Sequence, residues 1–199
     1  SGRGVALLDP HGDLADQVIE SVPTYRTRDV VLIDAGDAEQ AVAFNIFNCP
    51  NQKQEPLVAS GIVEVFKKLN ADLSWGPRLE DLLRNSARLL LEQPGTSLIS
   101  LERLLSDERF RQIVTRDVRD PTIRNYWRNE VPSWSRNERT VAVAAVLNKV
   151  RPFLANPFLR NIVGQSKSKI NLREIMDDQR ILIVNLSKAS LGDDASGLL

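Results

Sequence analysis

Residues 5–14 read Val-Ala-Leu-Leu-Asp-Pro-His-Gly-Asp-Leu, so an apolar run leads directly into a polar cluster of turn-forming residues. A strand without polar alternation is apolar on both faces, which suits a parallel sheet covered by helices on each side. Asp9 then stands at the carboxyl end of this strand, where open α/β sheets bind their ligands. The segment predicts an α/β fold with a candidate site at Asp9.

Further strand-like runs occur near the two ends of the sequence. The predicted strands cover residues 4–9, 29–34 and 180–186. Between the first two, residues 13–22 show helical spacing of apolar side chains, with Asp13 and Asp16 at the start, where the helix dipole favours acidic groups. A strand-helix-strand unit of this kind predicts parallel strands.

From Pro56 onward the apolar pattern becomes that of helices. Two apolar stripes are predicted, one from Val58, Ile62, Val65, Phe66 and Leu69 and one from Leu79, Leu82, Leu83, Ala87 and Leu90. Helix starts are predicted at Ser100, Ser106, Asp120, Ser135 and Asn156, a bend or stop near Pro152, and an end at Gly164. We therefore expect an all-helical domain, residues 56–168, inserted into an α/β domain formed by residues 1–55 and 169–199.

The formal net charge of zero conceals an uneven distribution of charge along the chain. Residues 56–168 hold roughly 18 basic and 12 acidic residues, an excess near +6, and the flanking segments hold the opposite excess. Arginine predominates, which suits pairing with phosphate or carboxylate groups. The densest basic run, and the candidate nucleic-acid-binding set, consists of Arg109, Arg111, Arg116, Arg119, Arg124, Arg128, Arg136 and Arg139.

The chain is poor in the ligands that transition metals prefer. His11 is its one histidine and Cys49 its one cysteine, which excludes the multi-histidine shells of common zinc hydrolases. No metal site is therefore assigned, although a carboxylate site for Mg²⁺ stays possible. The alternative is an ordinary strand-to-helix turn in which Pro10 and Gly12 set the backbone and Asp13 caps the helix.

Several segments together resemble one family. They are the opening Gly-Arg-Gly-Val-Ala-Leu-Leu-Asp-Pro-His-Gly-Asp-Leu, Leu57-Val-Ala-Ser, Val65-Phe-Lys-Lys, Ser74-Trp-Gly-Pro-Arg-Leu-Glu, Leu147-Asn-Lys-Val, Asn156-Pro-Phe-Leu-Arg-Asn-Ile-Val-Gly and Ile181-Leu-Ile-Val-Asn-Leu-Ser-Lys. In this order they resemble type IV secretion coupling proteins and related conjugative DNA-transfer ATPases, which are ring-forming DNA pumps.

The resemblance implies a partial parallel-sheet P-loop NTPase core interrupted by an all-α domain. The sequence contains no Gly-x-x-x-x-Gly-Lys-(Ser/Thr) loop, which holds nucleotide phosphates. By comparison with the family, the chain is expected to be a central fragment between the Walker A and Walker B motifs, inactive alone. The intact parent would bind ATP and Mg²⁺ and form a hexamer in the cytoplasm, either free or attached to the cytoplasmic face of the inner membrane.

The resemblance also implies roles for particular residues. Asp9, His11 and Gly12 would border the nucleotide, and Asp9 and Asp13 are the candidates for a catalytic role. Lys188 follows the last predicted strand, where it can approach a nucleotide phosphate or a neighbouring subunit, or be a mobile surface lysine. The helical domain would contact single- or double-stranded DNA through its arginines, or an escort protein.

Other interpretations of the helical domain remain open. It can be a protein-docking module that receives a relaxase or effector without binding DNA, or a spacer within the ring. Its arginines can be solvated or ion-paired, and Ile123, Tyr126, Trp127 and Val131 have the helical spacing of core residues. No apolar stretch approaches the roughly 20 residues that span a bilayer, so a soluble cytoplasmic chain without a membrane segment is expected.

Overall fold

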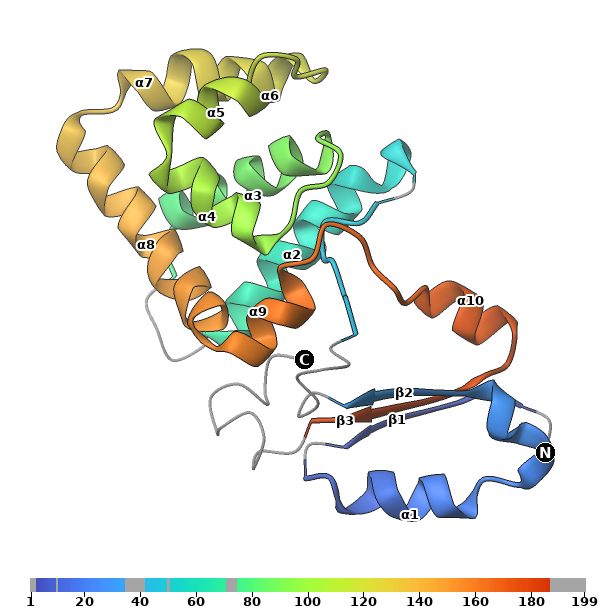
Figure 1. Ribbon diagram of the computed structural model, residues 1–199. Coiled ribbons are helices and arrows are strands. Elements are labelled where there is room, and N and C mark those ends of the chain that lie inside the picture. Colours follow the sequence, from blue (N-terminus) through green and yellow to red (C-terminus); the bar gives the residue numbers. More distant parts are fainter. Residues whose placement is uncertain (1–2, 10, 35–41, 50, 71–74, 187–199) are drawn as a thin grey trace. The chain divides into compact units, whose positions relative to one another are not determined.

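The computed structural model describes residues 3–9, 11–34, 42–49, 51–70 and 75–186. The chain divides into two compact units (Figure 1). We call residues Ser1–Phe44 and Asn156–Leu199 the sheet unit, and residues Asn45–Ala155 the helical unit. Both boundaries lie earlier in the sequence than the expected ones at Pro56 and Ser168.

The sheet unit contains a three-stranded parallel sheet in the order β1-β3-β2. The strands are β1 (Val5–Asp9), β2 (Val30–Asp34) and β3 (Ile181–Asn185). All three predicted strands are confirmed, each slightly shorter than expected, and so is their parallel direction. The strand that comes last in the sequence occupies the middle of the sheet.

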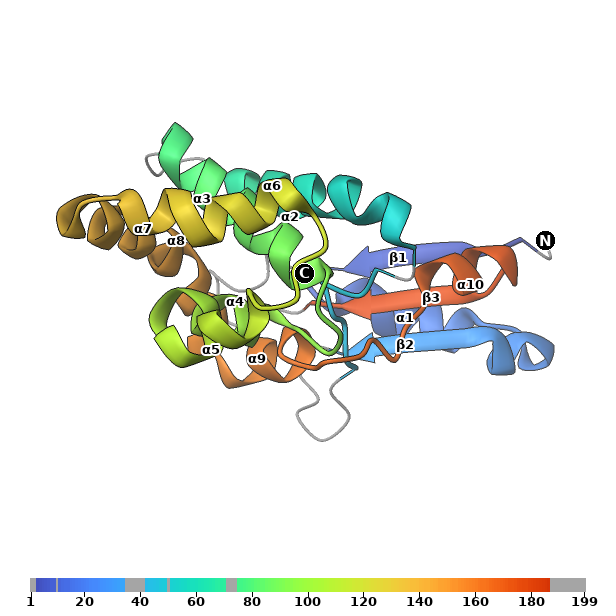
Figure 2. The same cartoon turned by 90° about the horizontal axis from the view of Figure 1, so that it is seen from above.

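Two helices of the sheet unit lie on opposite faces of this sheet. Figures 1 and 2 show α1 (Asp13–Ser21) on one face and α10 (Leu172–Asp177) on the other. The face toward α1 has a core of Ala15, Ile181 and Ile183, onto which Leu7 and Val18 pack. The described residues of this unit also form the helices η1 (Thr24–Asp29) and α9 (Pro157–Val163).

The burial of β1 differs from our expectation. We predicted that this strand is covered on both faces, but Val5 is 54% exposed and Leu8 58% exposed. The buried strand is β3, in which Ile181 to Val184 are all buried. Because β3 lies between the other two strands, β1 is left at an edge, where fewer neighbours cover its side chains.

The helical unit packs around α3 (Pro77–Leu91), whose residues Leu82, Leu83, Leu89 and Leu90 are almost fully buried. The other elements are η2 (Gln52–Gln54), α2 (Glu55–Leu69), α4 (Leu98–Ser106), α5 (Glu108–Val114), α6 (Pro121–Asn125), the π-helical turn η3 (Tyr126–Glu130), α7 (Val131–Ser133) and α8 (Arg136–Ala155). The described residues of this unit include no strand. The second predicted stripe is buried throughout, whereas Val65 of the first stripe is 50% exposed.

The predicted helix starts are confirmed in part. Asp120 and Asn156 cap α6 and α9, and Ser135 and Glu138 form the predicted capping box at α8. Two predictions are wrong. Ser97 caps α4, with Ser100 at the third helical position, and Asp107 caps α5 in place of Ser106. In both cases the residue that caps is one whose backbone is extended, which frees its side chain to accept from the first helical N–H groups. Pro152 lies inside α8, which ends soon after it at Ala155.

Two glycines provide a test of these local environments. A Cβ atom on Gly61, in the middle of α2, would meet no atom within 4 Å, whereas on Gly4 it would lie 3.0 Å from the backbone Cα of Gln179. We expect Gly61→Ala to raise the free energy of unfolding by about 0.5–1 kcal/mol, since alanine loses less backbone entropy in a helix. Gly4→Ala should lower it by about 1–3 kcal/mol through overpacking. Urea unfolding of both variants checks this, and stabilisation by Gly4→Ala would contradict the close approach at Gln179.

Candidate functional site

The carboxyl ends of the three strands bring polar side chains into one row. In the register of the sheet, Asp9 of β1 and Asp34 of β2 each lie beside Asn185 of β3. The amide nitrogen of Asn185 donates to the carboxylate of Asp34 at 3.5 Å. This is the edge at which parallel sheets bind ligands, so the row is the candidate site of the sheet unit.

Asp9 is the most buried member of this row, at 1% exposure. One carboxylate oxygen accepts from the backbone N–H of His11 at 3.0 Å, and the other accepts from Leu14 and Ala15 at 2.8 Å each. These last two N–H groups belong to the first turn of α1. Asp9 therefore ties the end of β1 to the start of α1, and both oxygens are engaged in doing so.

The environment also sets the ionisation of Asp9. Burial alone would raise the pKa of its carboxyl group, but hydrogen bonds from backbone N–H groups, that of His11 first, outweigh burial. The pKa consequently lies below its ordinary value. A carboxylate that stays ionised and already holds several N–H groups acts here as the anchor of the strand-to-helix turn.

The residues that follow Asp9 have different roles in the strand-to-helix turn. Gly12 precedes α1 with a φ of 92°, a left-handed conformation that glycine adopts without strain. Asp13 is the exposed first residue of α1, and its predicted capping role is performed by Asp9 instead. His11 is exposed and donates its backbone N–H to Asp9. Lys188 and Pro10 lie outside the described residues.

Sequence reasoning singled out Asp9 but missed Asp34 and Asn185. Each is the last residue of an apolar strand, and this position was the available signal. The parallel direction implies that strand ends share an edge, yet the register that places these residues beside Asp9 is a property of the folded sheet.

Most of the candidate arginines of the helical unit are engaged within the unit. Arg124 and Arg128 donate to backbone carbonyls of residues 115–118, the segment that follows α5. Arg111 pairs with Glu108 and donates to the carbonyl of Leu104 at 2.9 Å. The guanidinium of Arg139 donates weakly to the carbonyls of Val131 and Pro132. These side chains hold turns and helix ends together.

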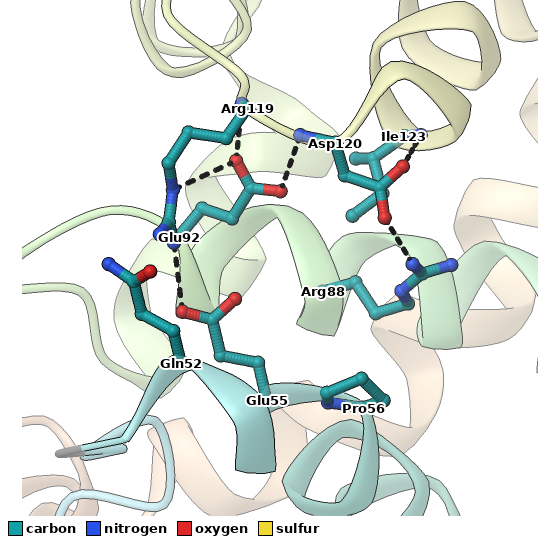
Figure 3. A pocket seen from close by; sticks show the side chains of 8 residues that line it. All are labelled: Gln52, Glu55, Pro56, Arg88, Glu92, Arg119, Asp120 and Ile123. Atoms are coloured by element: carbon teal, nitrogen blue, oxygen red, sulfur yellow. Dashed lines mark hydrogen bonds and ion pairs between the residues drawn. The ribbon is translucent and has the colours of Figure 1, made fainter.

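Arg119 belongs to an ion-pair network that Figure 3 shows from close by. Its guanidinium donates to Glu55 at 2.8 Å and lies 3.7 Å from Glu92, while Arg88 pairs with Asp120 at 2.5 Å. The carboxylate of Glu92 also accepts from the backbone N–H groups of Arg119 and Asp120. The groups surround a pocket of about 240 Å³, and their mutual pairing fastens the segment before α6 to α2 and α3.

Three of the candidate arginines differ from the rest. Arg109, Arg116 and Arg136 are exposed, and their side chains make no ion pair or hydrogen bond with any residue that the structure describes. Arg109 lies in α5, Arg116 follows that helix and Arg136 begins α8. Their guanidinium groups are therefore available to an external anion.

The apolar and aromatic side chains near these arginines are mostly buried. Ile123, Tyr126, Trp127 and Val131 are all buried, so the prediction of core positions is confirmed. Burial raises the pKa of the Tyr126 hydroxyl well above its ordinary range. Trp134 is half-buried, with the guanidinium of Arg78 at 5.6 Å from its ring centroid. The buried rings of Tyr126 and Trp127 cannot stack on a nucleic-acid base.

Comparisons with known proteins do not assign the chain. No family model matches it, and no curated protein matches it. Among the described residues, no group of three or more His, Cys, Asp or Glu side chains is arranged to hold a metal ion. No helix within the described ranges has both the length and the apolar character needed to cross a membrane.

Proposed function

We propose that this chain forms part of a DNA-translocating ATPase of conjugative transfer or type IV secretion, and that its helical unit contacts DNA. The order of the motifs that resemble the coupling proteins supports the assignment. The parallel sheet supports it too, because its strands come from segments before and after the helical unit. In the intact parent, ATP and Mg²⁺ would be bound by a phosphate loop, which this sequence does not contain.

The observation that carries the DNA contact is the set of unengaged arginines, Arg109, Arg116 and Arg136. Phosphate contacts supply most of the affinity in non-specific DNA binding, and each released counterion makes that affinity depend on salt. Three exposed guanidinium groups that meet no acceptor among the described residues suit this mode of binding. The proposed parent is a hexamer at the cytoplasmic face of the membrane, where such a surface would meet the DNA before translocation.

The second candidate function is a docking module for a relaxase or effector protein, without direct DNA binding. It is favoured by the engagement of Arg111, Arg119, Arg124 and Arg128 within the unit, since this leaves fewer cations for phosphates. The two functions make different predictions for DNA titrations.

We expect the 199-residue chain to bind duplex DNA in roughly the 10⁻⁴ to 10⁻⁶ M range at low salt, with an affinity that falls as salt rises. The triple variant Arg109→Gln, Arg116→Gln, Arg136→Gln should bind roughly tenfold more weakly and show a salt slope shallower by about two to three. Fluorescence anisotropy of labelled DNA at two salt concentrations measures both quantities.

A charge-matched control distinguishes a local contact from net charge. Arg28, Arg160 and Arg173 are exposed arginines of the sheet unit, and their replacement by glutamine changes the total charge equally. This control should retain the binding of the unchanged chain. If neither single-stranded nor duplex DNA binds to the unchanged chain at low salt, the proposed DNA contact is wrong and the docking function is favoured.

A further inference from the structure

The exposed arginines Arg109 and Arg116 lie on one face of α5 and of the turn that follows it. Ile113 is four residues after Arg109 and three before Arg116, and these spacings make side chains neighbours on a helix. The backbone N–H of Arg116 donates to the carbonyl of Ile113 at 3.2 Å, so the helical path continues into the turn. Ile113 is 61% exposed, and no acidic residue occurs between the two arginines. The face therefore presents two cations without a carboxylate between them.

Arg128, in the π-helical turn η3, holds the turn after α5 in place. One terminal nitrogen of its guanidinium donates to the carbonyl of Thr115 at 3.2 Å and to that of Arg116 at 2.8 Å. These carbonyls lie at the carboxyl end of α5, where a helix leaves its last acceptors unpaired. Among the described residues, no other side chain from outside α5 and this turn is hydrogen-bonded to Thr115 or Arg116. Arg128 is therefore the contact that fixes the backbone carrying Arg116.

The next residues of this segment are anchored by other groups. Val118 is 1% exposed, and its carbonyl accepts from the guanidinium of Arg124 at 3.1 Å. The carboxylate of Glu92 accepts from the backbone N–H of Arg119 at 2.6 Å. Because these contacts do not involve Arg128, loss of the Arg128 guanidinium should release the turn around Arg116 and leave the rest of the segment in place.

We infer that Arg128 is a positioning residue for the DNA contact: by holding the carbonyls of Thr115 and Arg116, it keeps the Arg116 guanidinium on the same face as that of Arg109. The inference rests on the proposed DNA contact and names a residue that shapes it. The Arg128 cation also lies at the negative end of the α5 dipole, where it offsets partial charge that would repel a phosphate next to Arg116. Arg116 contacts the phosphate, and Arg128 acts through the turn.

A double-mutant cycle between Arg128 and Arg116 tests this role on the full chain, with labelled duplex DNA at two salt concentrations. Arg116→Gln should weaken binding about two- to threefold and make the salt slope shallower by about one, the value for one phosphate contact. Arg128→Gln should weaken binding measurably, but by no more than Arg116→Gln does. The double variant should match Arg116→Gln in affinity and in slope, because no guanidinium is left for Arg128 to position.

Two results of this cycle overturn the positioning role. If the losses add and the slope becomes shallower by about two, Arg128 contacts a phosphate itself. If Arg128→Gln binds DNA like the unchanged chain, the turn does not need Arg128. In an Arg109→Gln background, Arg128→Gln should keep its full effect, since Arg116 is still present there.

Arg151→Gln is the charge-matched control. Arg151 is exposed on α8 in the same unit and pairs with Glu102, so its replacement removes an equal charge without touching the turn after α5. This variant should bind DNA like the unchanged chain. An equal loss for Arg151→Gln and Arg128→Gln would assign the effect to net charge and overturn the positioning role.

Hydrogen exchange without DNA separates this inference from the proposed function. Arg128→Gln should accelerate exchange of the Arg116 amide several-fold and leave the amides of α3 unchanged. Unchanged exchange at Arg116 overturns the positioning role. DNA binding that depends on Arg116 but not on Arg128 overturns the positioning role and keeps the proposed function, whereas absence of all DNA binding by the unchanged chain overturns both.

Discussion

Replacing Asp9 with alanine should lower the free energy of unfolding of the sheet unit by about 4 kcal/mol, the largest effect we expect from a single substitution. The carboxylate is buried and accepts from the backbone N–H groups of His11, Leu14 and Ala15. Alanine would leave these donors without an acceptor where water has little access. Hydrogen bonds to a charged group contribute more than neutral ones, and unpaired buried donors carry their full desolvation cost.

This loss of stability should appear as faster hydrogen exchange of the β3 amides. These amides report on the sheet unit separately from the helical unit. Asp9→Asn retains an acceptor oxygen and should cost about half as much. Asp13→Ala is the control, because Asp13 is exposed in the same helical turn and should contribute less than about 1 kcal/mol through the helix dipole. Equal losses for Asp9→Ala and Asp13→Ala would contradict the anchoring role of Asp9.

The same carboxylate makes the stability of the sheet unit depend on pH. Because folding lowers the pKa of Asp9, its contribution is fully present above the pKa of the unfolded chain, which is about 3.9. The contribution then declines as the pH falls toward the folded-state pKa. Exchange of β3 amides should therefore accelerate on acidification below about pH 4 more in the unchanged chain than in Asp9→Asn, after correction for intrinsic rates.

The second large effect is expected at Arg26, where replacement by methionine should cost about 3 kcal/mol. Arg26 is 9% exposed and lies at the opposite end of the strands from Asp9. Its guanidinium donates to the carbonyl of Arg3 at 2.9 Å, to that of Gln179 at 2.7 Å, and to Asp29 at 3.0 Å. It thereby joins the residues that precede β1 and β3 to the helix η1 that leads into β2.

Methionine keeps the apolar stem of Arg26 and removes the donors, so the loss measures the hydrogen bonds rather than packing. Arg26→Lys should recover little of the stability, because one ammonium cannot reproduce a planar fork that donates in three directions. Arg28→Met is the control in the same helix, where the arginine is exposed and unpaired among the described residues. Urea unfolding of the three variants, monitored through the hydrogen exchange of β3 amides, checks these expectations. A loss at Arg28→Met as large as at Arg26→Met would contradict the role of Arg26.

The sequence predicted the elements more reliably than their surroundings. The strands were predictable because four consecutive apolar residues followed by Asp or Asn fit a short strand better than a helix. The helix starts at Asp120, Ser135 and Asn156 were predictable because capping depends on residues within one turn. Near Ser97 and Asp107, more than one polar residue could have capped the helix, and the local sequence did not distinguish them.

The candidate sites were less predictable. The eight arginines belong to one basic run of the sequence, but the fold gives some of them carbonyl or carboxylate partners and leaves Arg109, Arg116 and Arg136 exposed. The three tryptophans share a residue type, yet Trp127 is buried while Trp75 and Trp134 are half-buried. Arg119 pairs with Glu55, 64 residues away, while Arg124 and Arg128 donate to carbonyls of the turn that precedes them. Both kinds of contact depend on how turns and helices pack, and periodicity carries no information about them.

By itself, the sequence determined which segments become strands and helices, that the strands are parallel, and that a polar cluster follows β1. These properties follow from contacts within about one helical turn or one strand-helix-strand unit. The tertiary structure alone decided that β3 is central, that β1 is an edge strand, that Asp34 and Asn185 align with Asp9, and which charged groups remain unpaired. The physical reason is that burial and charge pairing depend on which distant segments pack together, and the local pattern of a segment does not specify its neighbours.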